Sequence, residues 1–260
     1  MRREDARIYI LANKPVEYGL PDNTLYRPLQ VGSGKPFTEL RDDIGDNIAN
    51  WNFLYAETTG TYYLWKMRPR HLKYVGQCQY RRRLEFEEDF DFDGLFQKYD
   101  VITCMPVVLF PNLGSQYMNC HSAGDMSLVR AIIEKENPEY VEDFDQYIMS
   151  GKFLFFANGF IMKSEDFDRY CEWLFNILEH FKAEKGWNTP EEAKLKIDQE
   201  IAEKKRNGYD GHIGNEGGDS NRYQRQVLGF VSERLLTLWI RHNFEPNKIY
   251  CQKYKTYEGV

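Results

Sequence analysis

The sequence lacks several features that define common protein classes. Its five Cys are scattered and form no Cys-x-x-Cys pair, which argues against a disulfide scaffold and fits a reducing compartment. Basic residues number 34 against 40 acidic ones, so the net charge is −6 and a general nucleic-acid binder is disfavoured. We therefore expect no nucleic acid among the partners of this protein.

Long hydrophobic runs are also missing. No stretch approaches the ~20 apolar residues that span a bilayer, and the start of the chain, Met1-Arg-Arg-Glu-Asp-Ala-Arg7, is too charged for a signal peptide. These absences predict a cytoplasmic protein. Any contact with a membrane is expected to be peripheral, at the inner face of the plasma membrane.

Complete nucleotide and metal fingerprints are absent as well. Gly32-Ser-Gly-Lys35 is similar to the end of a phosphate loop, but Leu29 stands where that loop needs its first glycine. Cys120-His121 could supply half of a metal site, yet no second pair has ligand spacing. A kinase, an oxidoreductase and a metal site built on this pair are therefore disfavoured.

Aromatic residues, in contrast, are plentiful. They make up 15% of the chain, with 18 Tyr and 17 Phe, and hydrophobic residues as a whole make up 42%. Carbohydrate and nucleotide sites use aromatic faces, so the enrichment fits such a site. A core rich in Tyr and Phe explains it equally well.

The pattern of apolar residues predicts strands alternating with helices. Strands are expected at residues 7–12, 73–80, 100–105 and 153–162, the last one either continuous or split at Asn158-Gly159. Helices are expected at 51–67, 127–135, 164–182, 189–207 and 224–242, with Ser164 and Thr189 as N-caps, and a loop at 16–40. The alternation indicates one α/β domain over residues 1–260. A charged helix and a Gly-rich segment form an insertion at about 187–221, and residues 208–221 are either a lid or acceptor loop or a loop without function.

Two charged segments could handle a diphosphate. Asp-x-Asp, the spelling of many metal-binding sites in glycosyltransferases, occurs at Asp89/Asp91 and Asp91/Asp93, although a solvated acidic loop is the simpler interpretation. The strand at 73–80 ends instead in Arg81-Arg82-Arg83. Guanidinium groups can neutralise a diphosphate without metal, and the alternative is a surface cluster paired with the acids that follow.

Five motifs in order carry a resemblance that spans about residues 7–242. They are Arg41-Asp-Asp-Ile-Gly-Asp-Asn47, Tyr74-Val-Gly-Gln-Cys-Gln-Tyr-Arg-Arg82, Asn158-Gly-Phe-Ile-Met-Lys163, Phe167-Asp-Arg-Tyr-Cys-Glu-Trp-Leu-Phe175 and Gly229-Phe-Val-Ser-Glu-Arg-Leu235. Together they resemble a bacterial family of capsule, exopolysaccharide and O-antigen gene clusters, long described as a domain of unknown function. The resemblance implies a GT-A-type glycosyltransferase with a Rossmann-like mixed sheet flanked by helices, and galactosyl transfer is among the activities assigned to that family.

The chain departs from the family pattern at three positions. The family strand typically reads Tyr-Val-Gly-Leu-Cys-His-Tyr-Arg-Arg, so Gln77 replaces a Leu and Gln79 replaces a His. Gly159 replaces a Met and brings the segment closer to the Asn-x-Gly strand of other GT-A enzymes. A changed substrate specificity or mechanism is the expected consequence of losing the His.

The resemblance also suggests which residues bind the donor. Asn13 and Lys14 stand where a family His-Lys pair ends the first strand, and we expect them near the nucleotide. The remaining donor-binding candidates are Asp43, Asp46, Asn47, Glu57, Tyr80, Arg81, Arg82 and Asn158. Two alternatives stay open: an Asx-type turn explains the group at 43–47, and a strand kink explains Asn158.

Two residues are candidates for catalysis. Glu233, placed at the start of the last helix, is the expected base of an inverting mechanism, with an ion pair to Arg234 or Arg222 as the alternative. His121 is the second candidate, because family members carry a His nearby.

These observations lead to one expected function and two alternatives. The expected function is transfer of a sugar, galactose among the candidates, from a nucleotide-diphosphate donor such as a UDP-sugar to a saccharide or lipid-linked glycan in polysaccharide biosynthesis. The first alternative is the same reaction with Mn²⁺ or Mg²⁺ held by Asp89, Asp91 and Asp93. The second is a non-catalytic nucleotide-sugar- or glycan-binding component of a polysaccharide assembly complex.

Overall fold

Two parallel strands, β1 (Ala6–Ala12) and β4 (Tyr74–Gln79), form the centre of a mixed sheet in a computed structural model that describes residues 5–207 and 222–257. Their side chains alternate between the two faces of the sheet, as the period of a strand requires. Tyr9 of β1 and Val75 of β4 enter one core, while Ile8 and Cys78 enter the other. The alternation predicted for residues 73–80 is confirmed.

The sheet has the order β10-β6-β9-β4-β1-β2-β3. The other strands of this path are β2 (Tyr26–Gln30), β3 (Leu40–Arg41), β6 (Val101–Cys104), β9 (Phe160–Lys163) and β10 (Ile249–Gln252). β9 runs antiparallel to both of its neighbours, whereas the other pairs on the path are parallel. The short strands β5 (Arg82–Arg83) and β11 (Lys255–Thr256) extend β4 in antiparallel pairing, and β7 (Val107–Val108) pairs with β8 (Phe153–Leu154) in a separate ribbon.

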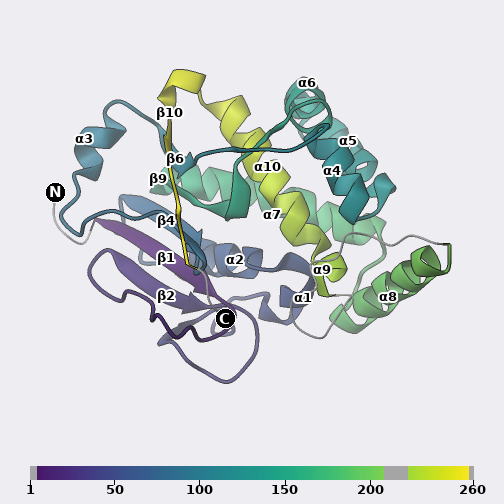
Figure 1. Cartoon of the computed structure of the whole chain (residues 1–260), viewed down its shortest axis with the longest axis horizontal. Coiled ribbons are helices and arrows are strands. Elements are labelled where there is room, and N and C mark those ends of the chain that lie inside the picture. Colours follow the sequence, from purple (N-terminus) through teal and green to yellow (C-terminus); the bar gives the residue numbers. More distant parts are fainter. Residues whose placement is uncertain (1–4, 208–221, 258–260) are drawn as a thin grey trace.

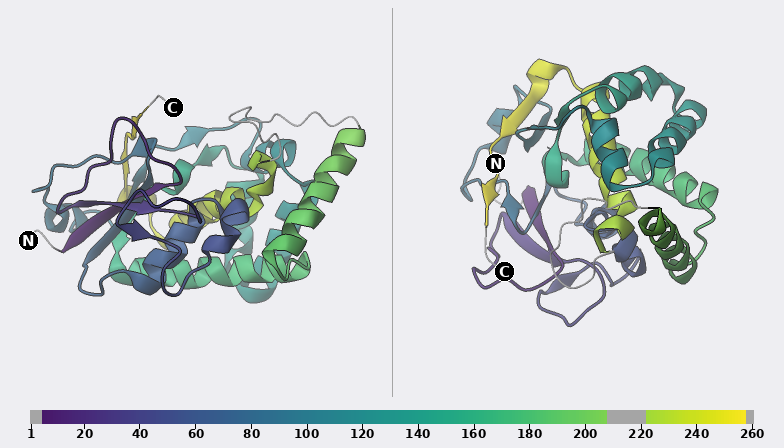
Figure 2. Two further views of the ribbon diagram at one scale, coloured as in Figure 1. Left: turned by 90° about the horizontal axis from the view of Figure 1, so that it is seen from below. Right: turned by 45° about the vertical axis from the view of Figure 1, so that its right-hand side comes forward.

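Most of the helices gather on one side of the strands, and α8 lies at the far end of the molecule (Figures 1 and 2). The helices are α1 (Asn52–Tyr55), α2 (Thr58–Met67), α3 (Phe92–Phe96), α4 (Leu113–Cys120), α5 (Ala123–Glu136), α6 (Val141–Asp143), α7 (Ser164–Glu184), α8 (Pro190–Arg206), α9 (Arg222–Arg225) and α10 (Val227–Asn243). The expected α/β class, a mixed sheet flanked by helices, is confirmed.

The two faces of the sheet are covered differently. Residues of α7 and α10, such as Tyr170 and Trp239, pack on the face that carries Tyr9 and Val75. The opposite face is covered by the short helix α3, by the segment before β2 and by aromatic side chains such as Phe86 and Phe90. Helices therefore bury one face, and loops with only short elements bury the other.

The order of the strands identifies the edge where ligands are expected. From β1 the chain continues to β2 and β3 on one side, and it returns to place β4 on the other side of β1. In open α/β sheets, ligands bind at the carboxyl ends of strands beside such a reversal. That edge lies at Ala12 and Gln79, and the antiparallel β9 begins there with Phe160.

Four expected elements differ from the structure, and the break in the helix expected at 51–67 is described with the site below. The loop expected at 16–40 contains β2, whose apolar pattern is interrupted by Arg27 and Pro28. Pro28 has no N–H to donate, but β3 pairs only with Leu29 and Gln30, so no bond to β3 is lost. Ser164 does not cap α7. It is the first helical residue, and its hydroxyl donates to the carbonyl of Leu72 instead.

The helix expected at 224–242 is broken. α9 and α10 are separate helices with Gln226 between them, so Glu233 lies in the second turn of α10 rather than at a helix start. By contrast, the N-cap expected at Thr189 is confirmed, since its hydroxyl accepts a bond of 3.2 Å from the N–H of Glu192. The Gly-rich segment 208–221 lies outside the described residues.

Candidate active site

A break in the helix expected at 51–67 positions Glu57. Ala56 adopts φ +49, which ends α1, and Glu57 stands immediately before α2. The first turn of α2 comes close to the carboxyl ends of β1 and β2, because Gly60 has no side chain there: a Cβ would lie 2.8 Å from Val31 and 3.0 Å from Leu11. The N-terminus of a helix favours a negative charge, so the Glu57 carboxylate suits this position.

Asn158 contacts Glu57 from the turn that precedes β9. Ala157 and Asn158 both have positive φ, at +65 and +47, and turn the chain sharply just before β9. The side chain of Asn158 is only 3% exposed, and its Nδ2 donates to Glu57 Oε1 at 3.0 Å and to Ser232 Oγ at 3.3 Å. The split of the strand at 153–162 is thus confirmed, and the kink directs the side chain of Asn158 toward the Glu57 carboxylate.

Glu233 approaches the same turn from α10. Its side chain is 6% exposed, and its Oε1 accepts a bond of 2.9 Å from the backbone N–H of Ala157. Burial and, to a smaller extent, the neighbouring charge of Glu57 raise the pKa of Glu233 to about 7, although Arg234, the N–H of Ala157 and Arg82 oppose the shift. A carboxyl group with this pKa can exchange a proton near neutral pH.

Gln79 and Arg82 complete the group. Gln79 Nε2 donates to Glu57 Oε1 at 2.8 Å, and Gln79 Oε1 accepts from Arg82 Nη1 at 3.3 Å. The Arg82 guanidinium also lies over the ring of Phe156, 4.7 Å from its centroid. We call Glu57, Gln79, Arg82, Asn158 and Glu233 the carboxylate cluster.

The carboxylate cluster joins four parts of the chain at the expected ligand-binding edge of the sheet. It brings together an acid able to exchange protons, a second carboxylate, an amide and a guanidinium. Such a set can take a proton from a hydroxyl group and neutralise the negative charge of a leaving group.

The remaining residues expected near the donor are less close to the carboxylate cluster. Asn13 and Lys14 follow β1 at the same edge. Tyr80 turns its ring into the core of the other sheet face, and its carbonyl accepts a bond from Tyr18 at 3.2 Å. The Arg81 guanidinium lies 5.5 Å from the Tyr80 ring. Of the two arginines expected at a diphosphate, the one in contact with the cluster is Arg82.

The acidic turn at 43–47 forms local contacts. Asp43 pairs with Arg41 at 3.1 Å, and Asn47 Oδ1 accepts from the N–H of Ala49 at 3.1 Å, as in an Asx turn. Asp46 accepts a bond of 3.1 Å from Tyr62, in the middle of α2. These contacts fit the Asx-turn alternative.

Asp42, which was not among the candidates, is the buried acid of this segment. Its Oδ1 accepts a bond of 2.8 Å from the N–H of Gly32, and burial raises its pKa to about 6. It thereby fixes the loop after β2. In the sequence, Asp42 could not be distinguished from its acidic neighbours.

His121 lies outside the carboxylate cluster. Its ring packs against Tyr117 and Phe230, with centroids 4.9 and 4.5 Å away, and it borders a small hollow under α8. Burial, with the nearby charge of Arg234, lowers the pKa of His121 to about 3. Its affinity for a proton is therefore too low for an effective general base at neutral pH.

The acids at 89–93 lie at the opposite end of β4. Asp91 caps α3 by accepting a bond of 3.0 Å from the N–H of Gly94, and Asp93 contacts Lys73 and Tyr74, which lower its pKa. Tyr74 begins β4 and Gln79 ends it, so about 17 Å of strand separates the two sites. No group of three potential metal ligands occurs among residues 5–207 and 222–257, and a metal held by these acids stays an untested alternative.

The candidate site residues from the sequence did not include Gln79, Thr58 or Ser232. Ser232 Oγ lies 2.8 Å from Thr58 Oγ1, which ties α10 to the first turn of α2 behind Asn158. Gln79 had a signal, since it replaces the family His, and the structure places it between Glu57 and Arg82. Long-range pairs such as Ser232 and Thr58 leave no trace in a single sequence.

Comparison with known families places this chain. Residues 7–204 match the model of a family described as Domain of unknown function (DUF4422). The chain belongs to the DUF4422 family. The matched segment contains four residues of the carboxylate cluster and ends before α10, which carries Glu233. No curated protein matches the chain.

The fold of this DUF4422 member is similar to a solved structure, the apo form of the bifunctional glycosyltransferase WbbM. The two align with a TM-score of 0.69 at 22% identity, over 96% of this chain and 45% of that one. The chain therefore spans less than half of the length of WbbM. In the described part of the chain, no helix is both long and apolar enough to cross a membrane.

Proposed function

We propose that this DUF4422 member is a GT-A-type glycosyltransferase that uses a nucleotide-diphosphate sugar. The observation that carries the proposal is the convergence of Glu57 and Glu233 on the adjacent residues Asn158 and Ala157, beside the Arg82 guanidinium. This convergence lies at the carboxyl edge of β1 and β4, where the order of the strands favours a ligand. The fold shared with WbbM supports the same reaction class.

The donor is proposed to lie across the carboxyl ends of β1 and β4. Asn13 and Lys14 would contact the nucleotide, and Arg82 would face the diphosphate, since a guanidinium can bind two phosphate oxygens at once. Glu57 and Asn158 would then accept from and donate to hydroxyl groups of the sugar. A UDP-sugar is the proposed donor, with galactose the first sugar to test.

Glu233 is the proposed base. It would take the proton of an acceptor hydroxyl as that oxygen attacks the anomeric carbon of the sugar. The bond between this carbon and the diphosphate oxygen breaks, and the nucleoside diphosphate leaves with the electron pair beside Arg82. A base with a pKa of about 7 combines an ionised fraction at neutral pH with useful proton affinity. The acceptor is proposed to be a saccharide or a lipid-linked glycan of polysaccharide biosynthesis in the cytoplasm.

A nucleotide-sugar screen tests the proposal. Thermal unfolding is followed with UDP- and GDP-sugars, with and without Mn²⁺, because a ligand of the native state raises the melting temperature. The donor that stabilises the protein is then incubated with saccharide acceptors, and the released nucleoside diphosphate is measured. Stabilisation with turnover is expected. Binding without turnover over any acceptor would indicate a non-catalytic module, and no binding at all would remove the proposal.

A further inference from the structure

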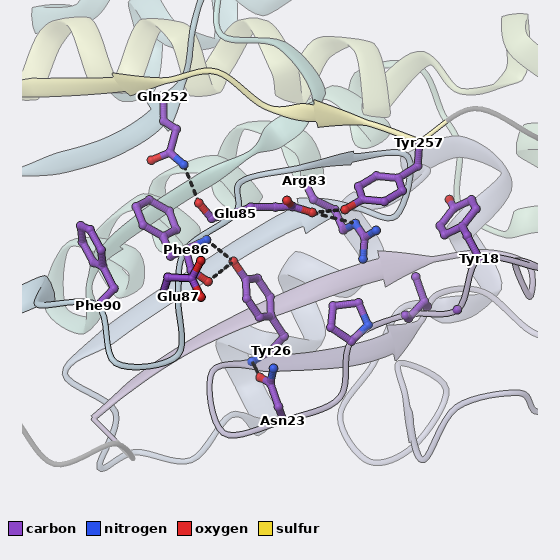
Figure 3. A pocket seen from close by; sticks show the side chains of 13 residues that line it. Tyr18, Asn23, Tyr26, Arg83, Glu85, Phe86, Glu87, Phe90, Gln252 and Tyr257 are labelled. Atoms are coloured by element: carbon purple, nitrogen blue, oxygen red, sulfur yellow. Dashed lines mark hydrogen bonds and ion pairs between the residues drawn. The ribbon is translucent and has the colours of Figure 1, made fainter.

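A second hollow, separate from the carboxylate cluster, opens on the loop-covered face of the sheet. It has a cavity volume of about 720 Å³ and lies between the segment before β2 and the segment after β5. Figure 3 shows Tyr26 and Asn23 on one wall, with Arg83, Glu85 and Tyr257 on the other. No member of the carboxylate cluster lines it.

Arg83 is the unusual group in this hollow. The residue is only 4% exposed, and its buried Nε has no hydrogen-bond partner among the described residues. The contact with Glu85 is a loose one, since 4.0 Å separates Arg83 Nε from Glu85 Oε1. The guanidinium lies 3.4 Å from the ring centroid of Tyr257 and faces the hollow (Figure 3). Buried charged donors without acceptors are costly, so this arrangement favours a ligand that supplies acceptors.

The other lining groups define the chemistry of that ligand. Glu87 offers carboxylate oxygens as acceptors, and so does Glu85 beside its existing contacts with the Tyr257 hydroxyl and Lys255. Asn23 offers an amide as donor, because its Oδ1 already accepts from the N–H groups of Leu25 and Tyr26. The rings of Phe86 and Phe90 supply apolar surface at one end (Figure 3).

The charges around the hollow do not favour a simple ion. Arg83 and Lys255, whose Nζ lies 3.4 Å from Glu85 Oε2, balance the charges of Glu85 and Glu87, so no net charge attracts a small anion or a cation. A neutral ring with many hydroxyl groups suits these surroundings, since each hydroxyl both donates and accepts, while its C–H face packs on an aromatic ring.

We propose that this hollow, the Arg83 pocket, binds a neutral saccharide without acting on it. Arg83 donates to hydroxyl oxygens, Glu85 and Glu87 accept from hydroxyl groups, and the aromatic rings contact the sugar ring. The Arg83 pocket and the carboxylate cluster lie on opposite faces of the sheet. This is because Arg82 and Arg83 are neighbours in β5, so their side chains point to opposite faces. The proposal therefore stands whether or not the carboxylate cluster is catalytic.

The test measures binding of neutral disaccharides (lactose, maltose and cellobiose) by chemical-shift changes in the labelled protein, with digalacturonate as the anionic probe. We expect at least one neutral disaccharide to bind more tightly than digalacturonate and to shift signals of the Arg83 pocket. Arg83→Met and Glu87→Ala should each weaken that binding by about tenfold or more, as expected for a lost hydrogen bond to a charged group. Glu87 is exposed, so its variant keeps the test open if Arg83→Met does not fold.

Two control variants locate the bound sugar. Glu88→Ala removes the neighbouring carboxylate, which accepts a bond of 2.7 Å from Thr24 and does not line the pocket, so it should leave binding unchanged. Glu57→Gln, in the carboxylate cluster, should also leave it unchanged. The proposal is overturned if no neutral disaccharide binds at tens of millimolar or if the Glu87 variant binds normally. It is equally overturned if Glu57→Gln, rather than the pocket variants, abolishes binding.

Discussion

Arg82 and Arg83 are neighbours in β5, yet their surroundings differ. On the helix-covered side, Arg82 bonds Gln79, which bonds Glu57, and the chain of contacts continues to Asn158 and Ser232. On the loop-covered side, Arg83 lies in a hollow of about 720 Å³, and its buried Nε has no hydrogen-bond partner among the described residues. The carboxylate cluster is a network of hydrogen bonds that already exists without a ligand. The Arg83 pocket is a cavity in which the Nε of Arg83 lacks an acceptor.

The two proposals assign two kinds of recognition to one sheet. Groups that transfer protons and stabilise charge must be held in place before the substrate arrives, which requires partners on rigid elements. Groups that only bind a neutral sugar do not need such partners and can line an open hollow between loops. The predictions below test whether this division holds.

The largest effect is expected from Glu233→Gln. The amide can still accept the bond from the N–H of Ala157, but it cannot take a proton, so transfer should fall by roughly 10²- to 10⁴-fold. Donor binding, measured by calorimetry, should be kept. A variant with a near-normal rate would exclude Glu233 as the base. The proposed division between a catalytic face and a binding face of the sheet would then fail.

The same variant should change how stability depends on pH. The pKa of Glu233 is raised from an ordinary 4.5 to about 7, so the folded protein binds this proton more tightly than the unfolded chain does. Its contribution is fully present below pH 4.5 and is lost as pH rises through about 7. Wild type should therefore lose up to about 3 kcal/mol relative to Glu233→Gln between those pH values. Urea denaturation of both proteins across this range measures the difference, and parallel curves would contradict it.

Arg82→Ala should reduce donor turnover by roughly 10- to 100-fold, the effect of losing a hydrogen bond to a charged group. Arg81→Ala is the matched control from the same turn, and a smaller effect is expected, because Arg81 lies against the Tyr80 ring rather than in the carboxylate cluster. Steady-state kinetics with the identified donor decides between them. Equal losses would mean that both guanidinium groups contact the diphosphate.

The smallest effect concerns the strained turn before β9. Ala157 has φ +65, which glycine adopts without strain, so Ala157→Gly should raise the free energy of unfolding by about 1 kcal/mol. Ala193→Gly, inside α8, is the control and should lower it by a similar amount. Chemical denaturation of the two variants measures both signs. A destabilised Ala157 variant would show that the lost methyl contacts outweigh the relieved strain.

Regular parts of this fold could be predicted from the sequence. Alternation identified β4, and the 3.6-residue period identified α7, because one face of each element is buried. Thr189 followed by a proline predicted the start of α8. Alternation and helical period did not select Glu57, Arg82, Asn158 or Glu233. These candidates rest on side-chain chemistry and on the family resemblance, and nothing in a single sequence indicated which of them contact one another.

Other parts depend on tertiary contacts. β2 carries Arg27 and Pro28 and forms only because β1 supplies its partner. The helix break occurs at Ala56, so no glycine in the sequence predicts it, and this break sets the position of Glu57. Asp42 differs from Asp43 and Asp46 only in burial, which packing determines. Prediction succeeded where a local pattern sufficed and failed where a distant segment sets the geometry.

The anchoring of the β9 turn by α10 has a consequence for how the protein is made. Phe155 and Ala157 donate their N–H groups to Thr237 and Glu233, residues that are synthesised about 80 positions later. While the ribosome is still translating this stretch, the central strands can pair, but the turn before β9 has no partner for those two groups. The carboxylate cluster should therefore be complete only after α10 has been synthesised and has docked on this turn.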